Sequence, residues 1–208
     1  MFYTHDMEFY SGKQPSGPFH LPNDTASIVK RPISTMDKSA RNITVDNYFT
    51  SIPLANDLLL SHNLTTVGIL RKNKLEIPGE FLNINDRPTC STMSAFGKKD
   101  NNFLFASYIS EKKKSVLMLS TFHNEGIIDP TSIEAKKPEV ITFYNCTKGD
   151  MDVVDRLKSE YCVTRTSNRW PLSVFSTLLN IDSPLNIPCI NSNIIPDASK
   201  KNNRRHWC

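Results

Sequence analysis

Two acidic segments, far apart in the chain, contain the side chains best suited to chemistry. Residues 42–47 form a short β-branched stretch that leads to Asp46, and residues 147–155 carry Asp152 and Asp155. Carboxylate oxygens are the ligands that hard cations such as Mg²⁺ prefer. Two such cations, held roughly 3.5–4 Å apart, activate the attacking and the leaving oxygen of a phosphodiester. The sequence therefore predicts a divided metal site with Asp46, Asp152 and Asp155 as ligands.

The elements expected around these aspartates agree with such a site. Residues 41–46 are predicted to form a strand, and a carboxylate at the carboxyl end of a central strand points into the crevice where α/β proteins bind ligands. Residues 147–161 are predicted to form a helix. Asp152 and Asp155 would share one face of it and lie in its first two turns, where the helix dipole favours negative charge. The spacing also allows a second interpretation, in which Asp46 caps the following helix and Asp152 is an ordinary N-terminal acid.

Composition narrows the class of protein. The chain has 208 residues, of which 38% are hydrophobic and 22% charged, and this is typical of a globular protein with a core. It has no run of roughly 18 apolar residues that could cross a membrane, and its first residues do not resemble a secretory signal. The 5 cysteines are scattered without C-x-x-C spacing, which favours free thiols in a reducing compartment and argues against structural zinc. We expect a nuclear or cytoplasmic protein that is not secreted.

The basic residues recur as small clusters in segments expected to be loops. The net charge is only +4, so their distribution carries more information than their number. Clusters of this kind suit a phosphate backbone, although solvated turns on an ordinary surface would explain most of them one by one. The candidate DNA-binding residues are Arg71, Lys72, Lys74, Arg165 and Arg169.

The remaining pattern predicts an interrupted α/β chain. A strand or hairpin is expected in residues 1–12, a short helix capped by Asn23 or Asp24 and stopped by Pro32, a helix at residues 48–61 and a strand at residues 64–70. Residues 71–138 indicate a small β-rich insertion with strands near 90–96, 103–109 and 116–120. A strand at residues 139–144 precedes the acidic helix, and a last helix spans residues 170–181, after which prolines end the pattern.

Several blocks of sequence resemble one known family. They are Asn-Ile-Thr-Val-Asp-Asn-Tyr-Phe-Thr-Ser-Ile-Pro-Leu at residues 42–54, Val-Gly-Ile-Leu-Arg-Lys-Asn-Lys at residues 67–74, Thr-Lys-Gly-x-x-Asp-x-x-Asp at residues 147–155, and Arg-Thr-x-x-Arg-Trp-Pro at residues 165–171. In this order and at these separations they resemble piggyBac-type transposases and their domesticated relatives. The likeness extends over roughly residues 1–181.

The resemblance implies an α/β fold: a partial ribonuclease-H-like core, split by a β-rich insertion domain and followed by a short helical segment. Residues 1–72 and 139–161 would form the split core, residues 73–138 the insertion, and residues 162–208 a fragment of a helical dimerisation and DNA-binding region. Asp46 would be the second catalytic aspartate, Asp152 the third, and Asp155 a further aspartate of the same helix, with Mg²⁺ as cofactor. Family members cut DNA at transposon ends and join the freed 3′ ends to TTAA targets.

The sequence departs from the family pattern in four places. The family's first catalytic aspartate would fall before Met1, Asp150 replaces a glycine, Pro32 replaces an ordinary helix residue, and residues 182–208 lose the likeness. We therefore expect an inactive remnant of a transposase, in which a metal is lost or misplaced. Two alternatives remain. One is an enzyme that takes its missing carboxylate from Asp6, Glu8 or another chain, and the other is a non-catalytic module that binds DNA, a second copy or a full-length transposase.

Overall fold

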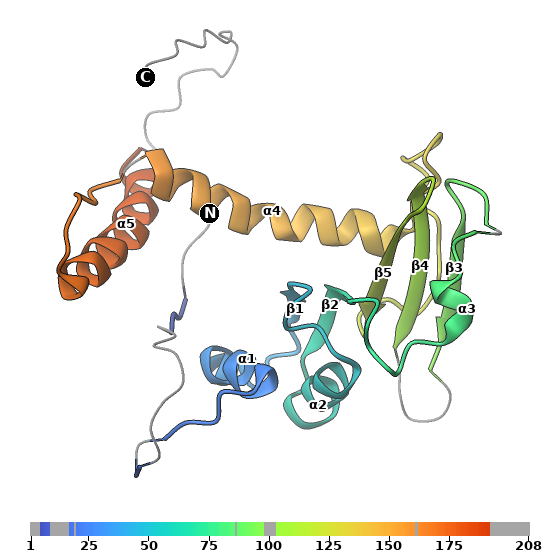
Figure 1. Ribbon diagram of the computed structural model, residues 1–208, viewed down its shortest axis with the longest axis horizontal. Coiled ribbons are helices and arrows are strands. Elements are labelled where there is room, and N and C mark those ends of the chain that lie inside the picture. The colour runs from blue at the N-terminus through green and yellow to red at the C-terminus, as the bar shows by residue number, and fades with distance from the viewer. Residues whose placement is uncertain are drawn as a thin grey trace, which may run out of the picture. The chain divides into compact units, whose positions relative to one another are not determined.

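The computed structural model describes residues 5–8, 17–18, 20–85, 87–97, 103–160 and 162–191. The chain divides into two compact units, one formed by residues 6–149 and the other by residues 150–208 with residues 1–5. The first unit holds a five-stranded mixed sheet with helices, which confirms the predicted α/β class (Figure 1). Helix α4 (Glu139–Glu160) begins in the first unit and continues into the second.

The motif around Asp46 lies in a strand–helix–strand segment. Strand β1 (Asn42–Val45) pairs in parallel with β2 (Thr65–Ile69), and α2 (Ile52–His62) connects them. The helix begins later than predicted because Ser51 caps it by accepting a hydrogen bond from the Leu54 amide. It ends at His62, and the next residue, Asn63, has a left-handed φ of 51° that turns the chain into β2.

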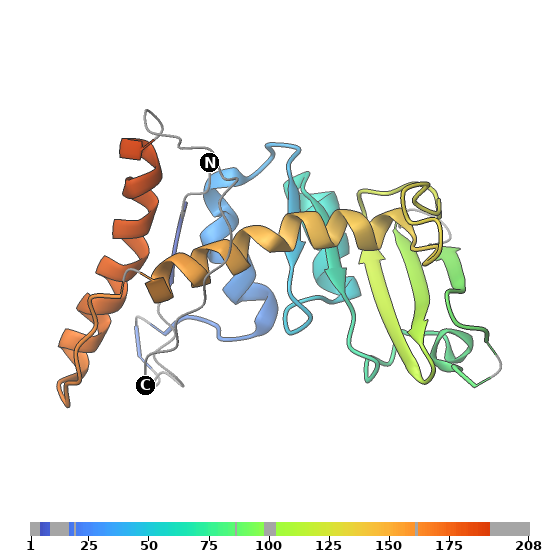
Figure 2. The same cartoon turned by 90° about the horizontal axis from the view of Figure 1, so that it is seen from above.

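The strands of the predicted insertion join the same sheet. Strands β3 (Thr92–Phe96), β4 (Leu104–Glu111) and β5 (Lys114–Ser120) match the three expected pieces, and the sheet order is β1-β2-β5-β4-β3. Because β5 pairs antiparallel with β2, the segment predicted to be an insertion continues the sheet whose strand β1 leads to Asp46 (Figure 2). The four-residue helix α3 (Gly79–Leu82) precedes β3.

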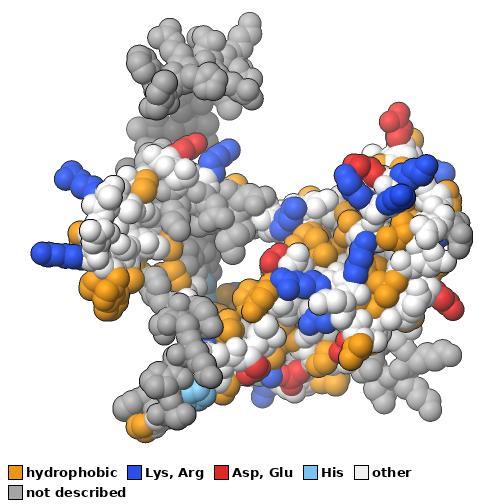
Figure 3. All heavy atoms as spheres, in the orientation of Figure 1, with side chains coloured by type: hydrophobic (Ala, Val, Ile, Leu, Met, Phe, Trp, Pro, Cys, Tyr) orange, Lys and Arg blue, Asp and Glu red, His pale blue; other side chains and the backbone are white. Residues whose placement is uncertain are grey.

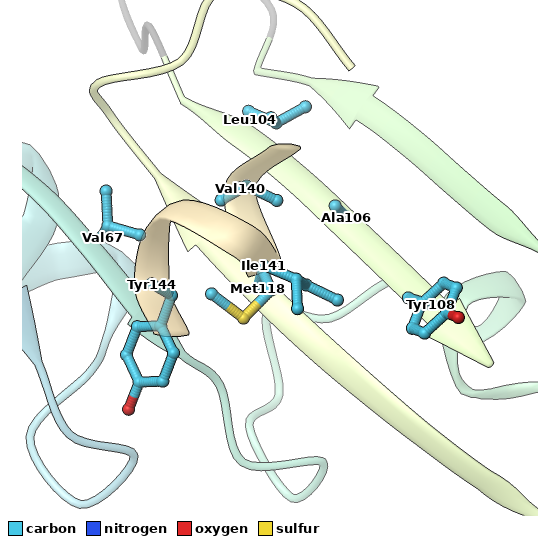
Figure 4. Packing of buried hydrophobic residues seen from close by; sticks show 8 residues of the cluster. All are labelled: Val67, Leu104, Ala106, Tyr108, Met118, Val140, Ile141 and Tyr144. Atoms are coloured by element: carbon cyan, nitrogen blue, oxygen red, sulfur yellow. The ribbon is translucent and has the colours of Figure 1, made fainter. Parts of the chain in front are cut away.

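Apolar side chains fill both faces of this sheet, as the two-residue period of a strand requires. On one face Val67, Leu104, Ala106, Tyr108 and Met118 pack against Val140, Ile141 and Tyr144 of α4 (Figure 4). A second cluster joins strand residues such as Phe105, Leu117 and Leu119 to Ala55 of α2 and Phe81 of α3. The first turns of α4 are thus part of the core.

That contact corrects one prediction. Residues 139–144 are not a strand but the start of α4, whose 22 residues begin at Glu139. The segment is rich in β-branched and aromatic residues, yet its buried residues Val140, Ile141 and Tyr144 have the spacing of one helix face. Burial of this face against the sheet overrides the local preference for a strand.

The segments near the ends of the chain differ from prediction in detail. Helix α1 (Thr25–Ile33) is capped by Asp24, as expected, but Pro32 lies within its last turn and does not stop it early. Helix α5 (Trp170–Asn191) continues past the predicted end at residue 181, through two prolines. Residues 5–8 are not in a strand, and the rest of the hairpin predicted in residues 1–12 lies outside the described residues. None of the helices in the described ranges combines the length and apolar character that a membrane crossing needs.

One glycine sets how closely β2 approaches the turn after β1. A methyl group at Gly68 would lie 2.3 Å from Thr50 Oγ1 and 2.8 Å from the Val45 carbonyl oxygen. Thr50 is 1% exposed, and its hydroxyl lies 2.8 Å from the Asp46 carbonyl oxygen and 3.2 Å from that of Val45. The missing side chain therefore lets Thr50 close the turn that carries Asp46.

We expect Gly68→Ala to destabilise the protein by about 1–3 kcal/mol, because overpacking forces buried groups apart. Urea unfolding measures this change. The matched control is Gly79→Ala, where an added methyl group meets nothing within 4 Å. Equal stability of the two variants would contradict the role assigned to Gly68.

Candidate active site at the ends of β1 and β2

Asp46 directly follows β1 and its side chain is exposed, while the preceding Val45 is buried. The Asp46 backbone carbonyl accepts hydrogen bonds from the amides of Phe49 and Thr50, both at 3.0 Å, and this fixes the turn. Within the described part of the chain, no hydrogen bond or ion pair engages the Asp46 carboxylate. The interpretation of Asp46 as the cap of the next helix is wrong, because Ser51 is that cap.

Arg71 comes to the same edge of the sheet from β2. The carboxyl ends of parallel strands meet at one edge, and Arg71 follows the end of β2 as Asp46 follows the end of β1. The Arg71 guanidinium donates from Nη2 to Asn47 Oδ1 at 3.4 Å, and its Cζ lies 4.9 Å from the centre of the Tyr48 ring. A candidate DNA-binding cation thus lies beside the turn that begins at Asp46.

The other candidate cations are partly or fully exposed. Lys72 is exposed and Lys74 half-buried in the loop after β2, and Arg165 and Arg169 are exposed in the segment before α5. Figure 3 shows further Lys and Arg side chains spread over this face of the unit formed by residues 6–149. Trp170, the first residue of α5, is 76% exposed.

A partly buried hydrogen bond connects the two acidic motifs. Thr44 of β1 donates from Oγ1 to Oγ1 of Thr147 on α4, at 2.8 Å, across 103 residues of sequence. The Thr147 hydroxyl in turn lies 3.1 Å from the Phe143 carbonyl and 3.2 Å from that of Tyr144. Strand β1, which leads to Asp46, is therefore hydrogen-bonded to Thr147, the first residue of the second acidic motif.

The position of those two aspartates corrects the helix prediction. Because α4 begins at Glu139, Asp152 and Asp155 lie in its interior rather than in its first two turns. The dipole at the helix start therefore does not favour their charge, since its effect fades within the first turn. The alternative of an ordinary N-terminal acid is wrong for the same reason.

The side chains of Asp152 and Asp155 lie outside the described residues, so the three-carboxylate site stays a prediction. Among the residues that are described, no group of three or more His, Cys, Asp or Glu side chains could hold a metal ion. Asp46 itself suits a cation, because its carboxylate is exposed and has no described protein donor to satisfy it. A hard oxygen ligand of this kind fits Mg²⁺.

A cluster around His123 follows β5 and is not apparent in the sequence. Ser120 Oγ accepts hydrogen bonds from the amides of Phe122 at 3.1 Å and His123 at 3.0 Å. These two bonds use both of its acceptor sites, so the Ser120 hydroxyl donates its own proton to His123 Nδ1 at 2.8 Å. The imidazole is therefore neutral, with its proton on Nε2. Burial lowers the pKa of His123, and the charge of Glu139 offsets part of that effect. Stacked Phe122 and Phe143, with ring centres 5.1 Å apart, cover the imidazole.

Comparison with known proteins identifies the family. The family model described as transposase IS4 matches residues 1–182. The chain belongs to this transposase family. It is also similar to the piggyBac transposase in a cryo-EM structure of its synaptic complex with hairpin DNA, at 34% sequence identity and a TM-score of 0.73. That likeness covers 82% of this chain and 34% of the piggyBac chain, so the transposase-family chain spans about a third of that relative's length.

These matches confirm the predicted family and its likeness to piggyBac, and the matched region takes in both acidic motifs. Cys90, Cys146 and Cys162 form no disulfide bond within the described part of the chain. The roles of individual residues in this transposase-family chain, and its predicted domain boundaries, remain predictions.

The link between the motifs can be tested by a double-mutant cycle. We expect Thr44→Val and Thr147→Val to be coupled by about 0.5–1.5 kcal/mol in urea unfolding, because each single change removes the same hydrogen bond. The matched control is Thr177→Val, which removes a helical hydroxyl that bonds Ser173 of its own helix at 2.9 Å. Thr177→Val should be additive with Thr44→Val. Additivity of the first pair would contradict the link.

Protonation of His123 should destabilise the fold. Its folded pKa is lowered below the unfolded value of about 6.5, so the unfolded state binds more protons in the window below pH 6.5. The stability from neutral His123 is complete above that pH and is lost as the pH falls toward the folded pKa.

We therefore expect His123→Asn to flatten the fall in melting temperature between about pH 7.5 and 5.5. His20→Asn, at an exposed loop position, is the matched control and should keep the wild-type slope. Equal slopes for all three proteins would contradict this prediction.

Proposed function

We propose that the 208-residue polypeptide binds DNA at the edge formed by the ends of β1 and β2, and that it does not cleave DNA by itself. Asp46, Asp152 and Asp155 would bind Mg²⁺, and Arg71, Lys72 and Lys74 would contact DNA phosphates, with Arg165 and Arg169 as further contacts. The hydrogen bond between Thr44 and Thr147 is the observation that carries the proposal. It supports a divided carboxylate site because it joins the two segments that would supply the ligands.

The charges near Asp46 support DNA as the ligand. Arg71 and Lys72 are exposed after β2, and cations in this setting bind phosphates and release counterions from DNA. A carboxylate beside them would repel DNA unless a cation neutralised it, and a bound Mg²⁺ would do so while also contacting a phosphate oxygen. By family likeness, the DNA would be transposon ends and TTAA-type targets.

The absence of cleavage is proposed for residues 1–208 taken alone. The resemblance places the family's first catalytic aspartate outside them, and two-metal chemistry depends on the complete ligand set. A longer polypeptide, or a partner that supplied this carboxylate, would be expected to cleave. We therefore expect residues 1–208 to bind DNA but not to cleave it.

A second function is favoured by the exposed apolar residues of α5. Trp170 is 76% exposed, Leu172 48% and Phe175 56%, and a surface of this kind suits contact with another protein. The chain could then bind a second copy or a full-length transposase without DNA. The two functions differ in their response to salt, because phosphate contacts weaken steeply as salt rises and apolar contacts do not.

The proposal predicts a metal site that depends on Asp46. We expect Mn²⁺, used as a paramagnetic substitute for Mg²⁺, to broaden the NMR signals of the amides at residues 45–47 in the wild type. Asp46→Asn should lose this broadening, because an amide is a weaker ligand for a hard cation than a carboxylate. Glu76→Gln, at an exposed position in the loop after β2, is the matched control and should behave as the wild type.

In the same experiment series, a transposon-end duplex is incubated with the wild type and Mg²⁺. Duplex binding without nicking is the expected result. Nicking that Asp46→Asn abolishes would show an active enzyme and overturn the non-catalytic part of the proposal. Unchanged Mn²⁺ broadening in Asp46→Asn would overturn the metal site.

A further inference from the structure

We propose that Tyr48 and Asn47 are positioning residues that hold the Arg71 guanidinium ready for a DNA phosphate beside Asp46. The inference rests on the proposed DNA-binding function and assigns how its main cation is oriented. Tyr48 would contact the Arg71 guanidinium, and the positive charge that binds the phosphate would come from Arg71 alone.

The guanidinium is held from two sides. Its Cζ lies 4.9 Å from the centre of the Tyr48 ring, within the range of a cation–π contact, and Nη2 donates to Asn47 Oδ1 at 3.4 Å. Both partners come from the turn that Asp46 begins. The side chain of Arg71 is thus directed along this turn instead of extending freely into solvent.

Tyr48 can act as a support because its own position is fixed. Its ring meets the ring of Phe49 edge to face, with centres 4.9 Å apart and planes at 84°. The turn beneath it is closed by the Thr50 hydroxyl, which bonds the carbonyls of Val45 and Asp46. Tyr48 is nevertheless 51% exposed, so its role in the core is small and its contact with Arg71 lies at the surface.

The hydrogen-bonding capacity of Arg71 is largely unused. A guanidinium has five N–H donors, and one of them bonds Asn47. No carboxylate in the described part of the chain lies within ion-pair distance of Arg71. Arg31 differs, because Glu8 and the Pro22 carbonyl take its donors, and Arg87 differs because it bonds Ser91 and Ser107. Arg71 therefore has the donors and the charge that a phosphate needs.

The test measures binding of the full 208-residue chain to a fluorescent 20-base-pair duplex over a range of KCl concentrations. The proteins are the wild type, Arg71→Ala, Tyr48→Phe, Tyr48→Leu and the double variant Tyr48→Leu with Arg71→Ala. Loss of one phosphate contact should lower the slope of log K against log salt by about 0.9 in Arg71→Ala. Tyr48→Phe should match the wild type, because the aromatic ring and not the hydroxyl makes the contact.

Tyr48→Leu should weaken binding by roughly two- to fivefold, the loss expected for an exposed cation–π contact. The double variant should bind no more weakly than Arg71→Ala, because Tyr48 would act only through Arg71. Lys112→Gln, an equal loss of charge at an exposed position in the β4–β5 turn, is the matched control and should be additive with Tyr48→Leu. In the free protein, NMR should show Arg71 side-chain protons shifted upfield by the Tyr48 ring, and this shift should vanish in Tyr48→Leu.

The outcomes separate this inference from the proposed function. Failure of the wild type to bind the duplex at low salt would overturn the proposed function and this inference with it. If Arg71→Ala weakens binding but Tyr48→Leu does not, or if the two changes are additive, the proposed function stands and only the positioning role is overturned. Equal melting temperatures of Tyr48→Leu and the wild type would show that the change in binding does not come from unfolding.

Discussion

The close approach of β2 to the turn after β1 is the constraint on which the rest of the site depends. Gly68 has no side chain, so Thr50 fits against β2 and closes the turn through the carbonyls of Val45 and Asp46. This turn brings Asp46 out of the sheet as an exposed carboxylate and places Asn47 and Tyr48 beside Arg71. A larger residue at position 68 would separate the two strands or displace Thr50, and either change would alter the surroundings of Asp46.

The second organising contact is between the sheet and α4. Apolar residues of its first turns are buried against the sheet, and Thr147 bonds Thr44 at the point where the helix leaves that contact. The hydrogen bond is modest in energy, since a typical one contributes about 1 kcal/mol. Its importance is geometric, because it holds the strand that leads to Asp46 against the segment of α4 at Thr147.

On the surface of the chain, some charged side chains are held in place by neighbouring residues and others are not. Arg71 is held by an aromatic ring and an amide, whereas Lys72 is simply exposed. An oriented guanidinium loses less side-chain freedom when it binds a phosphate, so it contributes more to affinity than a free lysine of equal charge. The exposed apolar residues of α5 are a different kind of surface, suited to contact with protein.

The sequence by itself determined the family, the α/β class and, to within a residue at each end, the strands β1 and β2, because these depend on local patterns and on specific residues. It did not predict that residues 139–144 are helical or that Asp152 lies inside a long helix. The helix at residue 139 depends on burial of Val140, Ile141 and Tyr144 against strands distant in the chain, which no local pattern records. The pairing of Arg71 with Tyr48, and of Thr44 with Thr147, likewise required the tertiary structure, because only the packed sheet brings these residues within bonding distance.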